Sequence, residues 1–220
     1  KIIMSPSLSF RVLIALFASV IGTSLFAQEQ TITAQVYADN WFEFYVDGEV
    51  VMTDPVSIMT EMSFNAEVFS FETELPAQLA FHIMDYKEDD SGYEYIASSS
   101  KRQQLGGGGF MAEFTNASGD VVAATNSDWV CKVIHQAPLD TSCANDTQSC
   151  TANILPMPSG WASASFDDSD WPAAVVHTDR DVGPKREHGR LSWDAASEFI
   201  WGDDLKIDNT ILCRFTLSES

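Results

Sequence analysis

The stretch that decides the fold is Trp41-Phe42-Glu43-Phe44-Tyr45-Val46-Asp47-Gly48-Glu49-Val50-Val51. It joins two runs of aromatic and β-branched residues through an Asp-Gly pair. Such a pair tolerates the left-handed backbone that a two-residue hairpin turn requires. The stretch therefore predicts a β-hairpin with strands at 41–46 and 49–51.

Similar runs lie elsewhere along the chain. Strands are expected at 31–37, 67–72, 77–86 and 210–217, where apolar and polar residues alternate or turn residues bound an apolar run. The best helical candidate is the short segment 55–62, and its periodicity is weak. Many short strands without helices between them predict an all-β fold, either a sandwich or a barrel.

Composition narrows the class of protein. The chain has 220 residues, of which 45% are hydrophobic and 11% aromatic, so it can bury a packed core. It carries 32 acidic residues against 12 Lys and Arg, a formal net charge of −20. Because such a charge repels phosphate backbones and anionic lipid heads, nucleic acids and acidic membranes are excluded as expected partners.

The first 27 residues predict a secretory signal peptide. Arg11 precedes the apolar run 12–21, and small residues then lead to an expected cleavage after Ala27. Met4 is the expected initiator. The alternative is an uncleaved membrane anchor, although the run is shorter than the roughly 20 residues of a membrane span. The expected product is an exported protein, extracellular or periplasmic, with a single domain over residues 28–220 and no membrane insertion.

Four cysteines lie in the expected mature chain, and an even number in an exported protein indicates disulfides. Cys143 and Cys150 flank a six-residue loop, which favours a local pair. Cys131 and Cys213 would then pair with each other, each within a strand-like run. A zinc site is the alternative, but the spacing is not CxxC and no histidine adjoins these residues.

Several segments resemble, in order, those of galactose-binding-domain-like jelly-roll modules of the kind attached to glycoside hydrolases. The segments are 38–48, 107–112, 119–120, 127–129, 161, 166–174, 196–201 and 213–215. The resemblance implies an antiparallel β-sandwich of jelly-roll type, with Trp129, Trp171 and Trp201 in core positions. It also implies a non-catalytic role. Asp47 departs from the Asn that is usual in this hairpin, and either residue suits the turn.

Motifs of catalysis are absent from the sequence. There is no Gly-x-Ser-x-Gly nucleophile elbow, no HExxH zinc motif and no carboxylate pair in a recognisable glycosidase context. The tetraglycine 106–109 lacks the GK[ST] ending of a phosphate-binding loop. We therefore expect these glycines to allow a close backbone approach, and we expect no enzymatic activity.

Two acidic clusters have alternative interpretations. Asp167, Asp168 and Asp170 would supply carboxylate oxygens to a structural calcium ion, or their side chains would bond backbone amides in a turn. The turn is favoured because the loop lacks the spacing of an EF-hand. The cluster of Asp85 with residues 88–90 indicates a solvated loop. Apart from the structural calcium ion of the first alternative, no cofactor is expected.

The polar stretch 177–190, followed by Trp193, is the predicted binding region. Long loops on a rigid sandwich often carry function. Trp193 would stack on a sugar ring while Asp179, Arg180 and Arg190 bond its hydroxyl groups. The expected partner is a carbohydrate or another extracellular polymer.

Three alternatives remain open for this region and for the whole chain. The polar stretch is a solvated loop that Trp193 anchors to the sandwich. The chain is an accessory part of a carbohydrate-active hydrolase whose catalytic part lies elsewhere. The chain is a structural matrix or surface protein, which predicts self-association.

Overall fold

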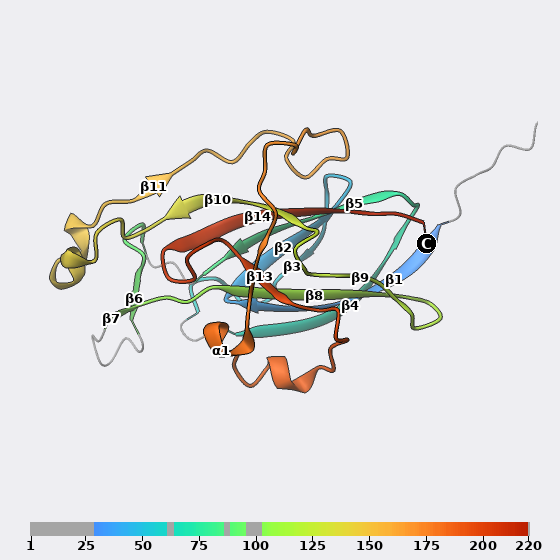
Figure 1. Cartoon of the computed structure of the whole chain (residues 1–220), viewed down its shortest axis with the longest axis horizontal. Helices are drawn as coiled ribbons and strands as arrows, with labels where there is room; N and C mark the ends of the chain where they lie inside the picture. Colours follow the sequence, from blue (N-terminus) through green and yellow to red (C-terminus); the bar gives the residue numbers. More distant parts are fainter. Residues whose placement is uncertain (1–28, 61–63, 86–88, 96–102, 220) are drawn as a thin grey trace, which may run out of the picture.

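The computed structural model describes residues 29–60, 64–85, 89–95 and 103–219, which form a sandwich of two facing sheets and a small separate hairpin (Figure 1). Neighbouring strands pair antiparallel in both large sheets. The expected all-β, antiparallel sandwich is confirmed. The predicted leader, residues 1–27, lies outside the described residues.

Sheet A has the strand order β12-β13-β8-β1-β4, with β9 paired to β8. The central strand β1 contacts β8 on one side and β4 on the other, over most of its length. The strands are β1 (Gln30–Asp39), β4 (Asn65–Thr73), β8 (Gly109–Asn116), β9 (Val121–Ala124), β12 (Val175–His177) and β13 (Phe199–Trp201).

Sheet B has the strand order β11-β10-β14-β5-β2-β3. The strands are β2 (Trp41–Val46), β3 (Glu49–Thr53), β5 (Ala77–Met84), β10 (Val130–Gln136), β11 (Asn153–Ile154) and β14 (Asp208–Leu217). A separate two-stranded ladder joins β6 (Tyr93–Tyr95) to β7 (Gln103–Leu105). It lies at one end of the sandwich, beside two short 3-10 helices, η1 (Thr141–Asn145) and η2 (Thr147–Ser149) (Figure 1).

The predicted hairpin is present between β2 and β3. Asp47 has φ of +52° and Gly48 has φ of +95°, the left-handed values that the Asp-Gly pair was expected to adopt. The Asp47 carboxylate also accepts a hydrogen bond from the backbone N–H of Gln78 at 2.9 Å. The helical candidate is wrong where the structure describes it: residues 55–60 form bends and turns.

The main core lies between the sheets and is rich in phenylalanine. Phe44 and Phe81 have ring centroids 4.6 Å apart, and Phe81 and Phe110 have centroids 4.7 Å apart. Trp129 and Trp201 are fully buried in this core, as the resemblance implied. Period-two alternation therefore placed the apolar residues correctly.

A long connection covers part of the outer face of each sheet. Trp161, Trp171 and the half-buried Phe166 pack over sheet B, where they contact outward-facing residues such as Leu212. The connection over sheet A packs on Tyr37, Met111 and Phe199. In Figure 1 the first connection runs above β10 and β14, and the second lies below β8 and β4. Each sheet is therefore covered on its inner face by the other sheet and on part of its outer face by a connection, while outward residues of β4 such as Glu72 stay exposed.

The glycine tract allows close approaches, as predicted. A Cβ atom on Gly106 would lie 1.9 Å from a carboxylate oxygen of Asp85, and one on Gly108 would lie 2.1 Å from the ring of Trp201. Neither position has room for a side chain. The tract brings the start of β8 against the loop that follows β5.

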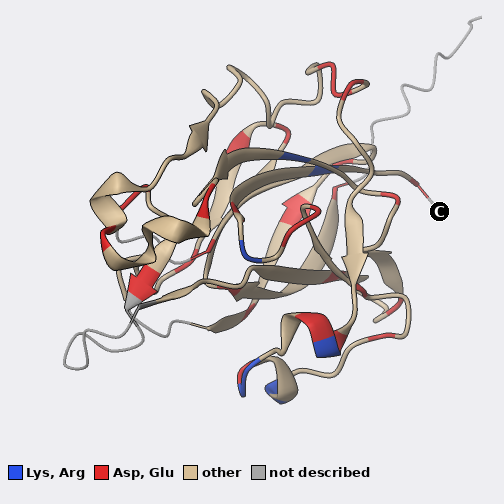
Figure 2. Cartoon of the chain, turned by 60° about the vertical axis from the view of Figure 1, so that its left-hand side comes forward, with Lys and Arg blue, Asp and Glu red and all other residues tan. Residues whose placement is uncertain are grey.

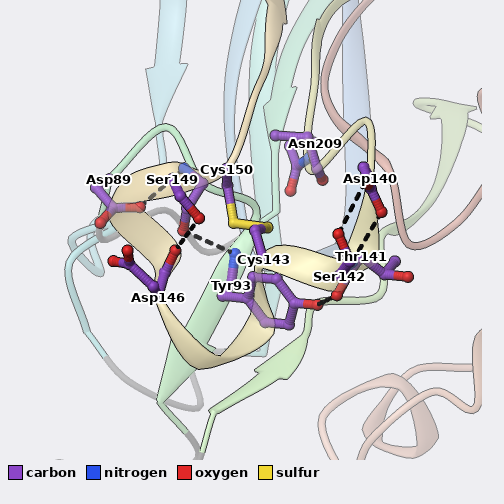
Figure 3. Close-up of a disulfide and its surroundings, with 12 residues drawn as sticks. Asp89, Tyr93, Asp140, Thr141, Ser142, Cys143, Asp146, Ser149, Cys150 and Asn209 are labelled. Carbon is purple, nitrogen blue, oxygen red and sulfur yellow. Dashed lines mark hydrogen bonds between the residues drawn. A yellow bond between two sulfur atoms is a disulfide. The ribbon is translucent and has the colours of Figure 1, made fainter.

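Both expected disulfides are present. Cys131 and Cys213 are paired opposite each other on β10 and β14, facing the core. Cys143 and Cys150 join η1 to the end of η2, where Tyr93 donates a hydrogen bond to the carbonyl of Thr141 (Figure 3). Two disulfides are typical of proteins from an oxidising compartment. None of the helices in the described part of the chain has the length and apolarity to span a membrane.

Candidate binding site

The predicted binding region lies on the outer face of sheet A, within the connection from Thr178 to Glu198, here called the 178–198 segment. It begins with α1 (Asp179–Val182), where Thr178 and Asp181 form a reciprocal capping box. Gly183 ends this turn with φ of +63°. A 3-10 turn, η3 (His188–Arg190), follows.

Hydrogen bonds tie the 178–198 segment to the sheet at two places. Near its start, the backbone N–H of Lys185 donates to the phenol oxygen of Tyr37 at 3.0 Å. Near its end, the carboxylate of Glu113 accepts from the N–H of Asp194 and from the hydroxyl of Ser197, both at 2.7 Å. Because Glu113 is buried, these bonds hold the segment against β8.

Trp193 is half-buried and packs on the histidine of η3. The rings of Trp193 and His188 are stacked, with centroids 5.4 Å apart and planes 13° apart. The indole N–H donates to the backbone carbonyl of His188 at 3.3 Å. His188 in turn contacts Tyr37 and Phe199 of the sheet. Trp193 therefore holds the segment in place and leaves part of its ring at the surface.

The other predicted binding residues differ in their relation to this aromatic pair: Asp179 acts on the charge of His188, whereas the two arginines extend into solvent. Burial lowers the pKa of His188, and the nearby negative charge of Asp179 opposes that effect. The structure therefore brings Asp179 and Trp193 to a common neighbour. Arg180 and Arg190 are exposed, and Arg190 lies 3.6 Å from a carboxylate oxygen of Glu187. His188 was not singled out by the sequence, because an isolated histidine in a polar stretch carries no motif.

Basic side chains gather on this segment of an otherwise acidic molecule. Figure 2 shows Lys and Arg positions on α1 and on the turns that follow it, whereas acidic positions are spread over the whole fold. Arg180, Lys185, Arg186 and Arg190 are all exposed. The 178–198 segment therefore carries both cationic and anionic side chains at the surface.

The start of the same segment closes a pocket at one end of the sandwich, here called the end pocket. The pocket has a volume of about 180 Å³. Carboxyl groups enter it from the end of β1, from the residue after β5 and from β6. Its lining residues are Asp39, Phe64, Asp85, Glu94, Gln104, Leu105, Gly106, Gly107, Val182 and Lys185.

Two carboxyl groups of the end pocket, those of Asp39 and Glu94, have raised pKa values. Burial raises the pKa of Asp39 to about 8; the positive charge of Lys185 opposes this shift, and the negative charge of Glu94 adds to it. Burial also raises the pKa of Glu94, whose carboxylate accepts a hydrogen bond from Gln104 at 2.8 Å. Strong pKa perturbation of a group in a recess is a mark of functional sites. No sequence pattern singled out Asp39, since its partners come from distant segments.

The acidic turn at 167–170 has a structural role in the described fold. Asp168 Oδ2 accepts a hydrogen bond from Nε of Arg214 at 2.6 Å, and Asp167 accepts one from the backbone of Ser169. The Asp167 bond matches the turn interpretation, whereas the Asp168 side chain pairs with an arginine instead of a backbone amide. No group of three or more His, Cys, Asp and Glu side chains within the described ranges is arranged to hold a metal ion.

Comparison with protein-family models, with curated proteins and with solved structures finds no match for this chain. Without a matching family, the protein is classified by its fold and by its candidate site. It is a disulfide-bonded antiparallel β-sandwich with a hydrogen-bonded polar segment on one face and a carboxyl-lined pocket at one end.

Proposed function

We propose that this protein is a secreted, non-catalytic binding module that recognises carbohydrate or another extracellular polymer. The observation that carries the proposal is the 178–198 segment. It holds a partly exposed aromatic ring and exposed charged side chains in a defined position, beside a polar pocket that it helps to close.

The chemistry of this surface suits a sugar. The exposed part of Trp193 offers an apolar face to a pyranose ring, and the planar guanidinium groups of Arg180 and Arg190 donate hydrogen bonds in fixed directions. Carboxylates such as Asp179 accept hydrogen bonds from hydroxyl groups. The end pocket is smaller than the roughly 300–1,000 Å³ of drug-sized sites, so it would take one residue of a longer polymer.

The sequence resemblance to galactose-binding-like jelly-roll modules supports the same function. The antiparallel sandwich is compatible with that fold. Two alternatives keep the fold and change the role: an accessory part of a hydrolase, and a structural surface protein. The accessory role requires that the domain binds a glycan and does not hydrolyse it. The structural role requires that the domain associates with itself and does not bind a glycan.

A glycan-array screen of the exported domain, followed by calorimetric titration of the glycans that bind, tests the proposal. Arg190→Ala is the informative variant, because this side chain is exposed and its removal leaves the packing of the segment intact. Lys132→Ala is the matched control, since Lys132 lies over Trp171 on the other sheet. We expect wild type and the control to bind with Kd values on the order of micromolar to millimolar.

The proposal is supported if Arg190→Ala weakens glycan binding and Lys132→Ala does not. It is contradicted if the folded wild type binds no glycan on the array. Release of hydrolysis products from a bound glycan by the isolated domain would contradict the non-catalytic role. A concentration-dependent increase in mass without glycan binding would favour the structural alternative.

A further inference from the structure

Acidic side chains outnumber basic ones among the residues that line the end pocket. Asp39, Asp85 and Glu94 line it, and Lys185 is the one cationic side chain among its lining residues. The Lys185 ammonium does not lie within salt-bridge distance of a carboxylate of the described residues. It donates instead to the carbonyl of Gly183 at 3.1 Å and lies 5.3 Å from the ring centroid of Phe64. The positive charge therefore stays at the rim.

The second, independent observation is the burial of the Asp39 carboxyl group. The residue is only 4% exposed, yet it lines the pocket, and its carboxyl group has no hydrogen-bond partner among the described residues. A buried carboxyl group without a partner carries a free-energy cost of desolvation that a ligand donor would relieve. An unpartnered acceptor at this depth points to a donor that enters from the pocket.

We infer that the end pocket binds a protonated primary amine, with the ammonium group against Asp39 and Glu94. The inference rests on the proposed function in one respect: the amine belongs to a residue of the bound polymer, such as an amino sugar without its acetyl group. Apolar walls from Phe64, Leu105 and Val182 would contact the carbon atoms next to the nitrogen. In such a poorly solvated recess, a charge-assisted hydrogen bond is stronger than a neutral one.

An ammonium group fits these residues better than a metal ion. The carboxyl groups of the pocket do not belong to any metal-holding arrangement found in the part of the chain that the structure describes. An ammonium group needs only separate acceptors, one for each of its N–H groups. Glu94 retains acceptor capacity beyond its bond from Gln104, and Asp39 has all of its own.

Binding should release a proton from Asp39. Because burial raises the pKa of Asp39 to about 8, the group is mostly protonated at pH 7. An ammonium group at contact distance favours the carboxylate, so the carboxyl proton passes to the solvent as the ligand binds. The charged or titratable groups that act on Asp39 are Lys185 of the 178–198 segment, Glu94 of β6 and the Tyr37 phenol of β1. The phenol stays neutral because burial raises its pKa further.

The test is calorimetric titration of the whole exported domain at pH 7 with three probes. These are a glucosamine tetrasaccharide, its fully N-acetylated counterpart and 1,5-diaminopentane. Each titration is repeated in two buffers of different ionisation enthalpy, which reports the protons released. The variants are Asp39→Asn and Glu94→Gln, with Glu72→Gln on the exposed face of β4 as the control.

We expect the free-amine tetrasaccharide to bind at least about ten-fold more tightly than the acetylated one, with proton release. Asp39→Asn should abolish the release and the preference, and Glu72→Gln should change neither. If Asp39→Asn fails to fold, Glu94→Gln and proton release by the wild type decide the matter. Equal binding of both tetrasaccharides overturns the amine site and leaves the proposed function standing. Binding of diaminopentane alone supports the amine site and removes carbohydrate as its source.

Discussion

Arg214 of β14 and Asp168 of the connection over sheet B form a close ion pair, with Nε and Oδ2 2.6 Å apart. The Arg214 side chain is 1% exposed, while that of Asp168 is 33% exposed. The guanidinium group also donates to the backbone carbonyls of Trp161 and Ser163 and lies over the ring of Phe166. One buried cation therefore fastens the part of the connection between Trp161 and Asp168 to the outer face of sheet B.

Replacing Asp168→Asn should lower the free energy of unfolding by about 1.5–3 kcal/mol, the range for a hydrogen bond to a charged group. The variant leaves the Arg214 charge buried with only neutral acceptors. Urea unfolding measures the change. Asp167→Asn is the matched control, because Asp167 is exposed and should alter stability by less than about 0.5 kcal/mol. Equal effects of the two variants would show that the ion pair does not stabilise the connection.

Trp171→Ala should lower the free energy of unfolding by roughly 3–5 kcal/mol, as for other buried tryptophans. Trp171 is 6% exposed, and its ring stacks on that of Trp161 with centroids 6.5 Å apart. Thermal unfolding checks the prediction. The expected loss is a large share of a typical stability of about 5–15 kcal/mol. A soluble variant with an unchanged Tm would contradict the packing described for this connection.

The two disulfides should contribute unequally to stability. The sequence separation is 82 residues for Cys131–Cys213 and 7 residues for Cys143–Cys150. Loop-closure entropy then predicts that the longer link stabilises by about 2 kcal/mol more. Urea unfolding of the two Cys→Ala double variants measures the difference. Equal losses in the two variants would indicate that the unfolded chain stays compact around the longer link.

The pH dependence of stability should reveal Asp39. Its pKa is about 8 in the folded protein, because of burial, against a usual value of 3.8. Between these values the folded protein holds a proton that the unfolded chain has lost, so the contribution to stability is complete below pH 4 and is lost as the pH rises to 8. The loss should be up to about 1.4 kcal/mol for each pH unit.

Asp39→Asn isolates this contribution, since Asp54 and Glu94 also titrate with raised pKa values in the wild type. Urea unfolding between pH 4 and pH 8 should show a steeper decline for the wild type than for the variant. Parallel curves would mean that Asp39 is ionised in the folded protein at neutral pH.

Trp193→Ala should abolish glycan binding and lower the free energy of unfolding by about 1.5–2.5 kcal/mol, roughly half the loss for a fully buried tryptophan. The matched control is Trp41→Ala, because Trp41 is also half-buried and also packs against a histidine, His82, on the other sheet. The control should lose similar stability and keep its glycan affinity. Retained binding by the Trp193 variant would make this residue an anchor of the segment alone.

Local patterns in the chain were sufficient for the strands and the hairpin. The range 41–46 matches β2 residue for residue, and the strands expected at 31–37 and 210–217 lie within β1 and β14. Side-chain alternation and turn chemistry act over a few residues, so they can be read without the fold. The short strands were missed because two to four residues are too few to show a period; these are β6, β7, β9, β11, β12 and β13.

Local sequence patterns did not predict the end pocket. Asp39, Asp85, Glu94 and Lys185 come from four segments, and only Lys185 lies within the predicted binding region at 177–190. Only the order of the strands and the path of the 178–198 segment bring them to one end of the sandwich. Burial and mutual charge then change their chemistry, and both depend on neighbours that are distant in the chain.

Tertiary packing also decides the burial of Arg214 and Trp193. Arg214 lies on the outer face of β14, where alternation alone predicts contact with solvent, but the connection over sheet B buries it. Trp193 belongs to the 178–198 segment and is half-buried because that segment packs on sheet A. Which residues face outward follows from the period of a strand, but whether anything covers them depends on tertiary packing.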